Sequence, residues 1–184
     1  MQEELKPVPT LSKSNDELFV DLVIERCQKD KGMAARLRRA DNPSMEYQSW
    51  EFLGALEYLG VDLEYENKRL PFVTLAAAIA KSKSEFNGKL TLGQAIAGCY
   101  KEGREDSQAK TRLRRLLACT ELAEVCRILR PILTLIESRV TQPLDYVRLL
   151  RQLRFFSFES GYRVKTQWAK EFYSQTVLTE EGAS

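Results

Sequence analysis

The chain is 184 residues long, with 43% hydrophobic and 29% charged residues, a composition typical of a globular protein and too apolar for a disordered one. Its formal net charge is only +2 and it contains no histidine. This absence disfavours much enzyme chemistry, because histidine is the commonest general base and metal ligand near neutral pH. No apolar run approaches the roughly 20 residues that span a bilayer. Residues 1–13 also lack the hydrophobic segment of a signal peptide, so we expect a cytoplasmic protein that does not enter a membrane.

Four cysteines, Cys27, Cys99, Cys119 and Cys126, are scattered along the chain without a C-x-x-C pair. Neither a zinc site nor a thioredoxin-like motif is supported by this spacing. We expect reduced helix residues that pack as small hydrophobic groups, and we predict no metal or other cofactor.

The first half is predicted to be helical after a flexible arm over residues 1–15. Ser14 can cap the first helix, and Glu17 can complete a capping box. Apolar spacing predicts helices over 16–30, 33–40, 46–59, 71–80 and 91–99. In these, Pro71 occupies a first helical position, and the almost wholly apolar run 72–80 indicates a central buried helix.

The second half begins at a charged link, residues 101–106. Apolar spacing beyond it predicts helices over 107–119, 121–139, 143–156 and 162–175, which could close a four-helix bundle. No stretch alternates as a strand does. The sequence therefore predicts an all-α protein, with a helical N-terminal part (16–100) packed on a C-terminal helical bundle (101–176) and followed by a flexible tail (177–184).

The densest basic cluster lies in residues 26–39, which carry six basic side chains and one acid. On a helix Arg36 and Arg39 share a face, and Leu37 and Ala40 form a buried stripe opposite it. Phosphate groups could lie along the arginine face.

Arginines recur at three-residue spacing in the second half: Arg112 with Arg115, Arg127 with Arg130, and Arg148 with Arg151 and Arg154. Arginine presents planar, forked donors that match phosphate oxygens. The rows therefore favour salt-sensitive contacts with a nucleic-acid backbone, indifferent to base sequence. The alternative is that these faces are solvated or form ion pairs, with Glu121, Glu124, Asp145 and Glu159 as candidate partners. Periodicity alone does not decide between the two.

Aromatic residues gather late in the chain, at Phe155, Phe156, Phe158, Tyr162, Trp168, Phe172 and Tyr173. They could stack on unpaired bases. The four-residue spacing of Trp168 and Phe172 on an amphipathic helix instead favours packing in the core or against a partner.

Five segments carry a family resemblance through their order and spacing. In chain order they are GMAARLRRA (32–40) followed by Pro43, LTLGQA (90–95), RLRRLL (112–117), LDYVRLL (144–150) and VKTQWAKEFY (164–173). Together they resemble the CasB family, the small subunit of the type I-E CRISPR complex Cascade, over residues 16–176.

The resemblance implies a non-catalytic, all-helical subunit, present as two copies side by side in an RNA-guided complex. Its implied partners are other Cascade subunits, the CRISPR guide RNA, the target DNA strands and a second copy of itself. Its implied role is to stabilise the R-loop during target recognition in antiviral defence. Nucleic-acid contacts are implied at Arg38, Arg39, Arg112, Arg127 and Lys165, and less directly at Arg36, Arg115, Arg130 and Arg163.

A second hypothesis is a structural helical adaptor, whose arginines bind acidic protein partners rather than nucleic acid. An enzyme is disfavoured, because the sequence offers no histidine, metal cluster or phosphate-binding loop.

Overall fold

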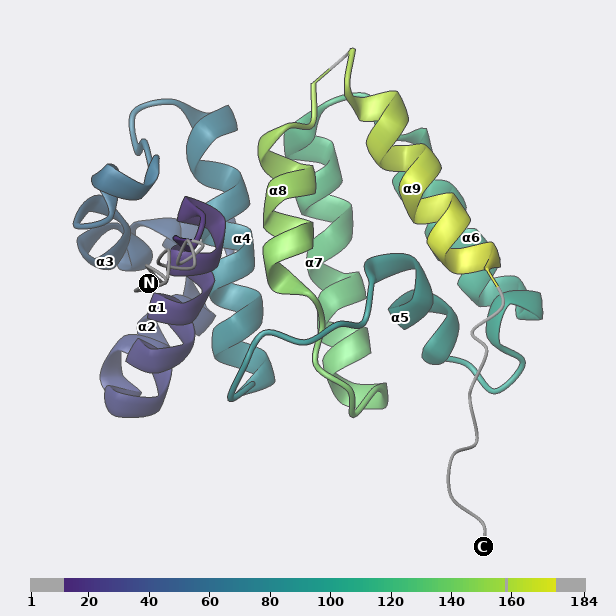
Figure 1. Cartoon of the computed structure of the whole chain (residues 1–184), viewed down its shortest axis with the longest axis horizontal. Coiled ribbons are helices and arrows are strands. Elements are labelled where there is room, and N and C mark those ends of the chain that lie inside the picture. The colour runs from purple at the N-terminus through teal and green to yellow at the C-terminus, as the bar shows by residue number, and fades with distance from the viewer. Residues whose placement is uncertain (1–11, 158, 175–184) are drawn as a thin grey trace, which may run out of the picture.

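The computed structural model describes residues 12–157 and 159–174, and the predicted arm and tail lie mostly outside these ranges. Nine α-helices occupy the described residues (Figure 1). They are α1 (Asn15–Lys29), α2 (Lys31–Arg39), α3 (Trp50–Gly54), α4 (Glu66–Ser82), α5 (Leu92–Gly98), α6 (Ser107–Ala118), α7 (Leu122–Arg139), α8 (Tyr146–Arg154) and α9 (Gly161–Tyr173). Three short 3-10 helices, η1 (Pro43–Ser49), η2 (Glu57–Leu59) and η3 (Gly103–Glu105), lie between them.

The predicted all-α fold is confirmed. The only β-type pairing among the described residues is an isolated parallel bridge between Leu90 and Leu144. None of the described helices is long and apolar enough to cross a membrane. The capping box predicted at the start of the chain is also present, because Ser14 caps α1 and exchanges hydrogen bonds with Glu17.

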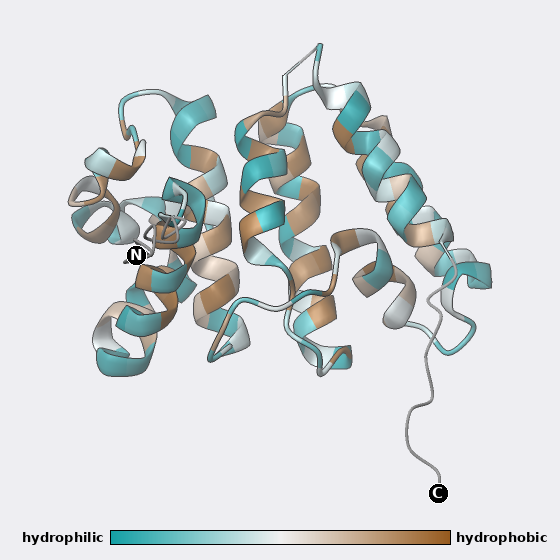
Figure 2. Cartoon of the chain, in the orientation of Figure 1, coloured by the Kyte–Doolittle hydropathy of each residue, from teal (hydrophilic) through white to brown (hydrophobic). Residues whose placement is uncertain are grey.

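Helix α4 is the central element of the fold. Every residue from Leu70 to Ala80 is buried, as the apolar run 72–80 predicted. The helix lies between α1 and α2 on one side and α7 and α8 on the other (Figure 1). The neighbouring helices carry alternating hydrophobic and hydrophilic faces (Figure 2), and they bury the hydrophobic ones.

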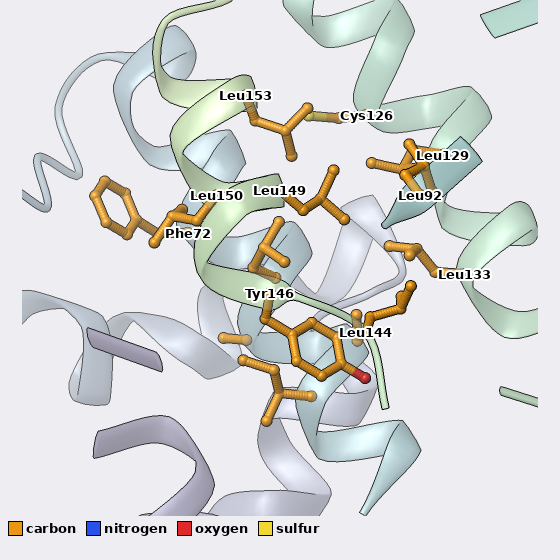
Figure 3. Packing of buried hydrophobic residues seen from close by; sticks show 14 of the residues in the cluster. Phe72, Leu92, Cys126, Leu129, Leu133, Leu144, Tyr146, Leu149, Leu150 and Leu153 are labelled. Atoms are coloured by element: carbon orange, nitrogen blue, oxygen red, sulfur yellow. The ribbon is translucent and has the colours of Figure 1, made fainter. Parts of the chain in front are cut away.

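Helix α8 packs against both α4 and α7. Figure 3 shows that Leu150 extends toward Phe72 of α4, whereas Leu149 and Leu153 extend toward α7. All four side chains are buried, and one hydrophobic cluster contains residues from α1 through α9. The division at residues 101–106 and the C-terminal four-helix bundle stay predictions.

Two predicted helix boundaries in the first half are wrong. Helix α4 begins at Glu66, five residues before Pro71. Its first turns contact η1 through Arg69, whose Nε lies 2.6 Å from Glu46 Oε1. The single helix predicted over 46–59 is instead η1, α3 and η2. Buried Ser49 donates its hydroxyl hydrogen to Glu46 O at 2.7 Å. The spacing of apolar residues does not reveal this local hydrogen bond.

The four cysteines are free thiols, and Cys99, Cys119 and Cys126 are buried. Burial raises the pKa of the Cys126 thiol to about 11, so this group is protonated near neutral pH. The prediction that the cysteines pack as small hydrophobic groups is confirmed for these three residues.

Helix α5 crosses α9 at Gly93. A Cβ at this position would lie 2.4 Å from the carbonyl oxygen of Trp168 and 2.5 Å from the amide nitrogen of Phe172. Both atoms belong to the backbone, so neither can move aside as a flexible side chain could. The absence of a side chain at Gly93 therefore permits this close crossing.

We predict that Gly93→Ala lowers the free energy of unfolding by about 1–3 kcal/mol, because the added methyl group must push α5 away from α9. Gly98→Ala is the matched control in the same helix, since its Cβ would meet only Val140 Cγ2 at 3.8 Å. This control should be neutral or stabilising by up to about 1 kcal/mol. Urea unfolding of both variants measures the difference, and equal stabilities would contradict the prediction.

Candidate nucleic-acid interface

Helix α2 presents three of the predicted arginines. The Asp30 side chain caps the helix by accepting a hydrogen bond from the amide of Met33 at 2.8 Å. Leu37 and Ala40 are fully buried, which confirms the stripe predicted opposite the arginine face. This packing leaves the arginine side chains on the outer side of α2.

The three α2 arginines differ in their surroundings. Arg38 donates to the backbone oxygen of Ala80 at 3.3 Å, and Arg36 Nη2 lies 3.8 Å from Glu51 Oε2. Arg39 is exposed, and no described residue forms an ion pair with it. Arg39 is therefore the α2 side chain with the greatest freedom to meet an external anion.

A cleft between α6 and α7 brings together Arg112, Arg115 and Arg127. Its volume is about 160 Å³, and its apolar lining comes from Ile128, Pro131 and Ile132. Arg115 is exposed. The Arg127 side chain is 72% exposed and lies 3.8 Å from Glu124 Oε1. Three arginines thus line one small, open hollow.

Tyr100 positions one of these guanidinium groups. Arg112 Nε donates to the Tyr100 hydroxyl oxygen at 2.5 Å, while the ring of Tyr100 also lies beneath Arg139, 5.3 Å from its Cζ. Holding Arg112 in place reduces the conformational entropy that it would lose on binding an anion. The role of Tyr100 could not be predicted from the sequence, because an isolated tyrosine 12 residues away carries no periodic signal.

Lys165 and Arg163 come from α9. Lys165 is partly buried and Arg163 is exposed. Burial and the nearby Glu124 raise the pKa of the Cys119 thiol, whereas the charges of Lys165 and Arg127 oppose this increase. Lys165 and Arg127 therefore both lie close enough to Cys119, at the end of α6, to influence its pKa. They are brought together although 38 residues separate them in the chain.

Arg130 has a different environment from the other predicted residues. Its side chain is only 10% exposed, with Nε 3.8 Å from Asp41 Oδ1. Lys81 also pairs with Asp41 and donates to Thr134 Oγ1 at 3.2 Å. This junction brings the segment after α2 against α4 and α7, so Arg130 is turned toward the protein.

The arginines of α8 form internal ion pairs. Arg148 Nη2 lies 2.7 Å from Glu171 Oε1, while Arg151 and Arg154 both pair with Asp16. The side chains of Asp16 and Glu171 are buried. The ion-pair alternative therefore holds for this row, but its partners come from α1 and α9 rather than from the acids named by the sequence.

The late aromatic residues divide into two groups. Trp168 and Phe172 are buried, and Trp168 Nε1 donates to Gln152 Oε1 at 2.8 Å, so the packing interpretation is confirmed for this pair. Phe156 is also buried and stacks on Trp168. Phe155, Tyr162 and Tyr173 are exposed, and Phe158 lies outside the described residues.

A second basic hollow, of about 420 Å³, lies where α1, α2 and the end of α4 meet. Its cations are Lys31, Arg38 and Lys83. The dense cluster at 26–39 pointed to the first two, whereas Lys83 is far along the chain. Lys83 could not be predicted as a part of this hollow, because tertiary packing alone brings it to this place.

The comparisons with known proteins agree on one family. Residues 33–173 match the family described as CRISPR-associated protein Cse2. The fold is similar to that of CasB from Thermobifida fusca, with a TM-score of 0.67 and 20% identity over 89% of this chain and 100% of that chain. M. ruber CasB gives a TM-score of 0.66 and 24% identity over 88% and 94% of the respective chains. No curated protein sequence matches significantly.

The matched residues cover about three quarters of the chain and include every segment that carried the resemblance except the first residue of GMAARLRRA. The two CasB structures show that the fold is also shared at low sequence identity. The chain therefore belongs to the CasB/Cse2 family, the small subunit of the type I-E CRISPR complex Cascade.

Proposed function

We propose that this protein is a non-catalytic Cascade subunit that holds nucleic-acid backbone and stabilises the R-loop during target recognition in antiviral defence. Its partners are the other Cascade subunits, the CRISPR guide RNA, the target DNA strands and a second copy of itself, in the cytoplasm. The observation that supports this most is the α6–α7 cleft, where Arg112, Arg115 and Arg127 surround one hollow.

The chemistry of the cleft suits a phosphodiester. Guanidinium groups donate paired hydrogen bonds to phosphate oxygens and keep their charge at all physiological pH values. The apolar lining from Ile128, Pro131 and Ile132 can contact a sugar without reading the base. Binding by such a surface is insensitive to base sequence.

The binding surface also includes Arg39 of α2 and Lys165 and Arg163 of α9. Arg36 and Arg38 of α2 contribute less directly, because Glu51 and the backbone oxygen of Ala80 already use part of their donor capacity. Arg130 contributes to the stability of the fold rather than to binding, because its side chain is turned toward Asp41. Modest affinity is sufficient for the proposed role, because R-loop formation is almost energetically balanced and backbone contacts can shift that balance.

No catalytic step is assigned to this surface. The sequence contains no histidine, and the cleft lining contains no acidic residue. Arginines and apolar groups can bind and orient a phosphate, but they provide no general base that is active near neutral pH.

We predict that changing Arg112, Arg115 and Arg127 together to alanine weakens binding of the isolated protein to single-stranded DNA by at least about tenfold at low salt. If each arginine neutralises one phosphate, the slope of log affinity against log salt becomes shallower by about 2, since single strands contribute about 0.7 per contact. Fluorescence anisotropy with labelled oligo(dT) at several salt concentrations measures both quantities.

The matched control removes three exposed cations outside the cleft, Arg26, Lys89 and Lys101, and therefore changes the net charge equally. If both triple variants lose affinity by the same factor, binding depends on net charge rather than on the cleft. If the wild-type protein binds no DNA even at low salt, and polynucleotide never displaces an acidic protein partner, the adaptor hypothesis is favoured.

We predict opposite effects for two arginines of α7. Arg130→Ala should lower the free energy of unfolding by about 1–3 kcal/mol, because it leaves the partly buried Asp41 with one cation fewer, and should leave DNA affinity unchanged. Arg127→Ala should weaken DNA binding without loss of stability, because its side chain is exposed. Denaturant unfolding and anisotropy on both variants test this, and a loss of DNA affinity in a folded Arg130→Ala protein would contradict it.

A further inference from the structure

Residues 40–67 form a segment with a charge opposite to that of the candidate interface. The segment contains seven acidic residues and no lysine or arginine. Asp41, Glu46, Glu51 and Asp62 pair with cations outside it, which leaves Glu57, Glu64 and Glu66 without an ion pair among the described residues. It comprises η1, α3, η2 and the start of α4, at the end of the molecule beyond α1 and α2 (Figure 1). Glu51, Glu57, Glu64 and Glu66 are exposed within it. We call residues 40–67 the acidic segment.

The acidic segment also exposes aromatic side chains. Nine large hydrophobic side chains are exposed in the described part of the chain, and four of them, Tyr47, Trp50, Tyr58 and Tyr65, belong to this segment. Tyr58 is 69% exposed and Tyr47 58%. Single exposed hydrophobic residues are ordinary, but tyrosine and tryptophan are the residues most enriched at the energetic centres of protein interfaces.

A groove adjoins these aromatics. It has a volume of about 370 Å³ and lies between α1 and the acidic segment, with Leu22, Phe52, Leu56 and Tyr58 among its lining residues. The groove offers an apolar recess in which a partner side chain could be desolvated. Its charged lining residues are Glu25, Arg26 and Lys29 of α1, and the exposed acids of the segment lie on the other side, where they could pair with cations of a partner. Such a combination is typical of an anchored protein contact.

We propose that the acidic segment is a docking surface for a protein partner whose facing surface is rich in lysine or arginine. Charge complementarity selects this class of partner, because exposed carboxylates repel phosphate groups while they attract cationic side chains. The boundary of the surface lies at Arg36 and Glu51, where Arg36 Nη2 is 3.8 Å from Glu51 Oε2. Nucleic acid meets the arginine faces, and protein meets the acidic segment.

The test rests on the proposed function, because it uses assembly with the other Cascade subunits and guide RNA as its readout. A charge variant combines Glu57→Lys with Glu64→Lys, and an aromatic variant combines Tyr47→Ala with Tyr58→Ala. The controls carry the same types of change outside the segment, at exposed positions: Glu85→Lys with Glu137→Lys, and Tyr162→Ala. Each chain is co-expressed with the remaining subunits, which are isolated through a tag on another subunit.

We expect both segment variants to be retained at least about tenfold less than wild type at physiological salt, and both controls to be retained normally. The isolated segment variants should melt at the wild-type temperature and bind oligo(dT) with at least wild-type affinity, because the arginine faces are unchanged.

Two outcomes would contradict the docking surface, and a third would contradict the proposed function. Normal retention of both segment variants would overturn the docking surface alone. A loss of oligo(dT) binding by the folded aromatic variant would also overturn it, since the aromatics would then belong to a nucleic-acid platform. Failure of the wild-type chain to be retained would instead overturn the proposed function, and with it the identity of the partner.

Discussion

The complete burial of α4 is the constraint on which the rest of the structure depends. From Leu70 to Ala80 this helix has no solvent-facing side, and each large apolar side chain contributes roughly 1.5–3 kcal/mol only when it is covered. Helices α1, α2, α7 and α8 must therefore each turn an apolar face toward it. Most of their charged residues are left on the outer faces, and the exposed positions of Arg39 in α2 and Arg127 in α7 follow from this arrangement.

The elements that could be predicted from sequence are those with local causes. The capping box of Ser14 and Glu17, the buried stripe of Leu37 and Ala40, and the central burial of α4 all arise from neighbouring residues. The start of α4 and the broken helix at 46–59 could not be predicted in this way. These two segments are joined by Arg69 and Glu46, which lie 23 residues apart in the chain, and such a contact leaves no periodic pattern.

The same limit applies to the candidate site. Arginines at three-residue spacing occur in α6, α7 and α8, and spacing alone gives them equal standing. Their surroundings differ because Asp16 of α1 and Glu171 of α9 pair with the α8 row, whereas no buried carboxylate among the described residues pairs with Arg115 or Arg127. Sequence can therefore identify which arginines share a helix face, but tertiary packing decides whether that face is free to bind a phosphate.

The charges are unevenly distributed over the molecule, which the net charge of +2 does not reveal. A small net charge produces weak long-range attraction, but opposite charges gathered on different elements produce a field that orients the molecule during an encounter. Arginines line the cleft of α6 and α7 and would attract phosphates, while the exposed carboxylates of residues 40–67 would repel them. Arg36 and Glu51 lie where these regions meet. Under the proposed function, an orientation that presents the cleft to a nucleic-acid strand is favoured over its reverse, and the proposed docking surface is then left for a partner of another class.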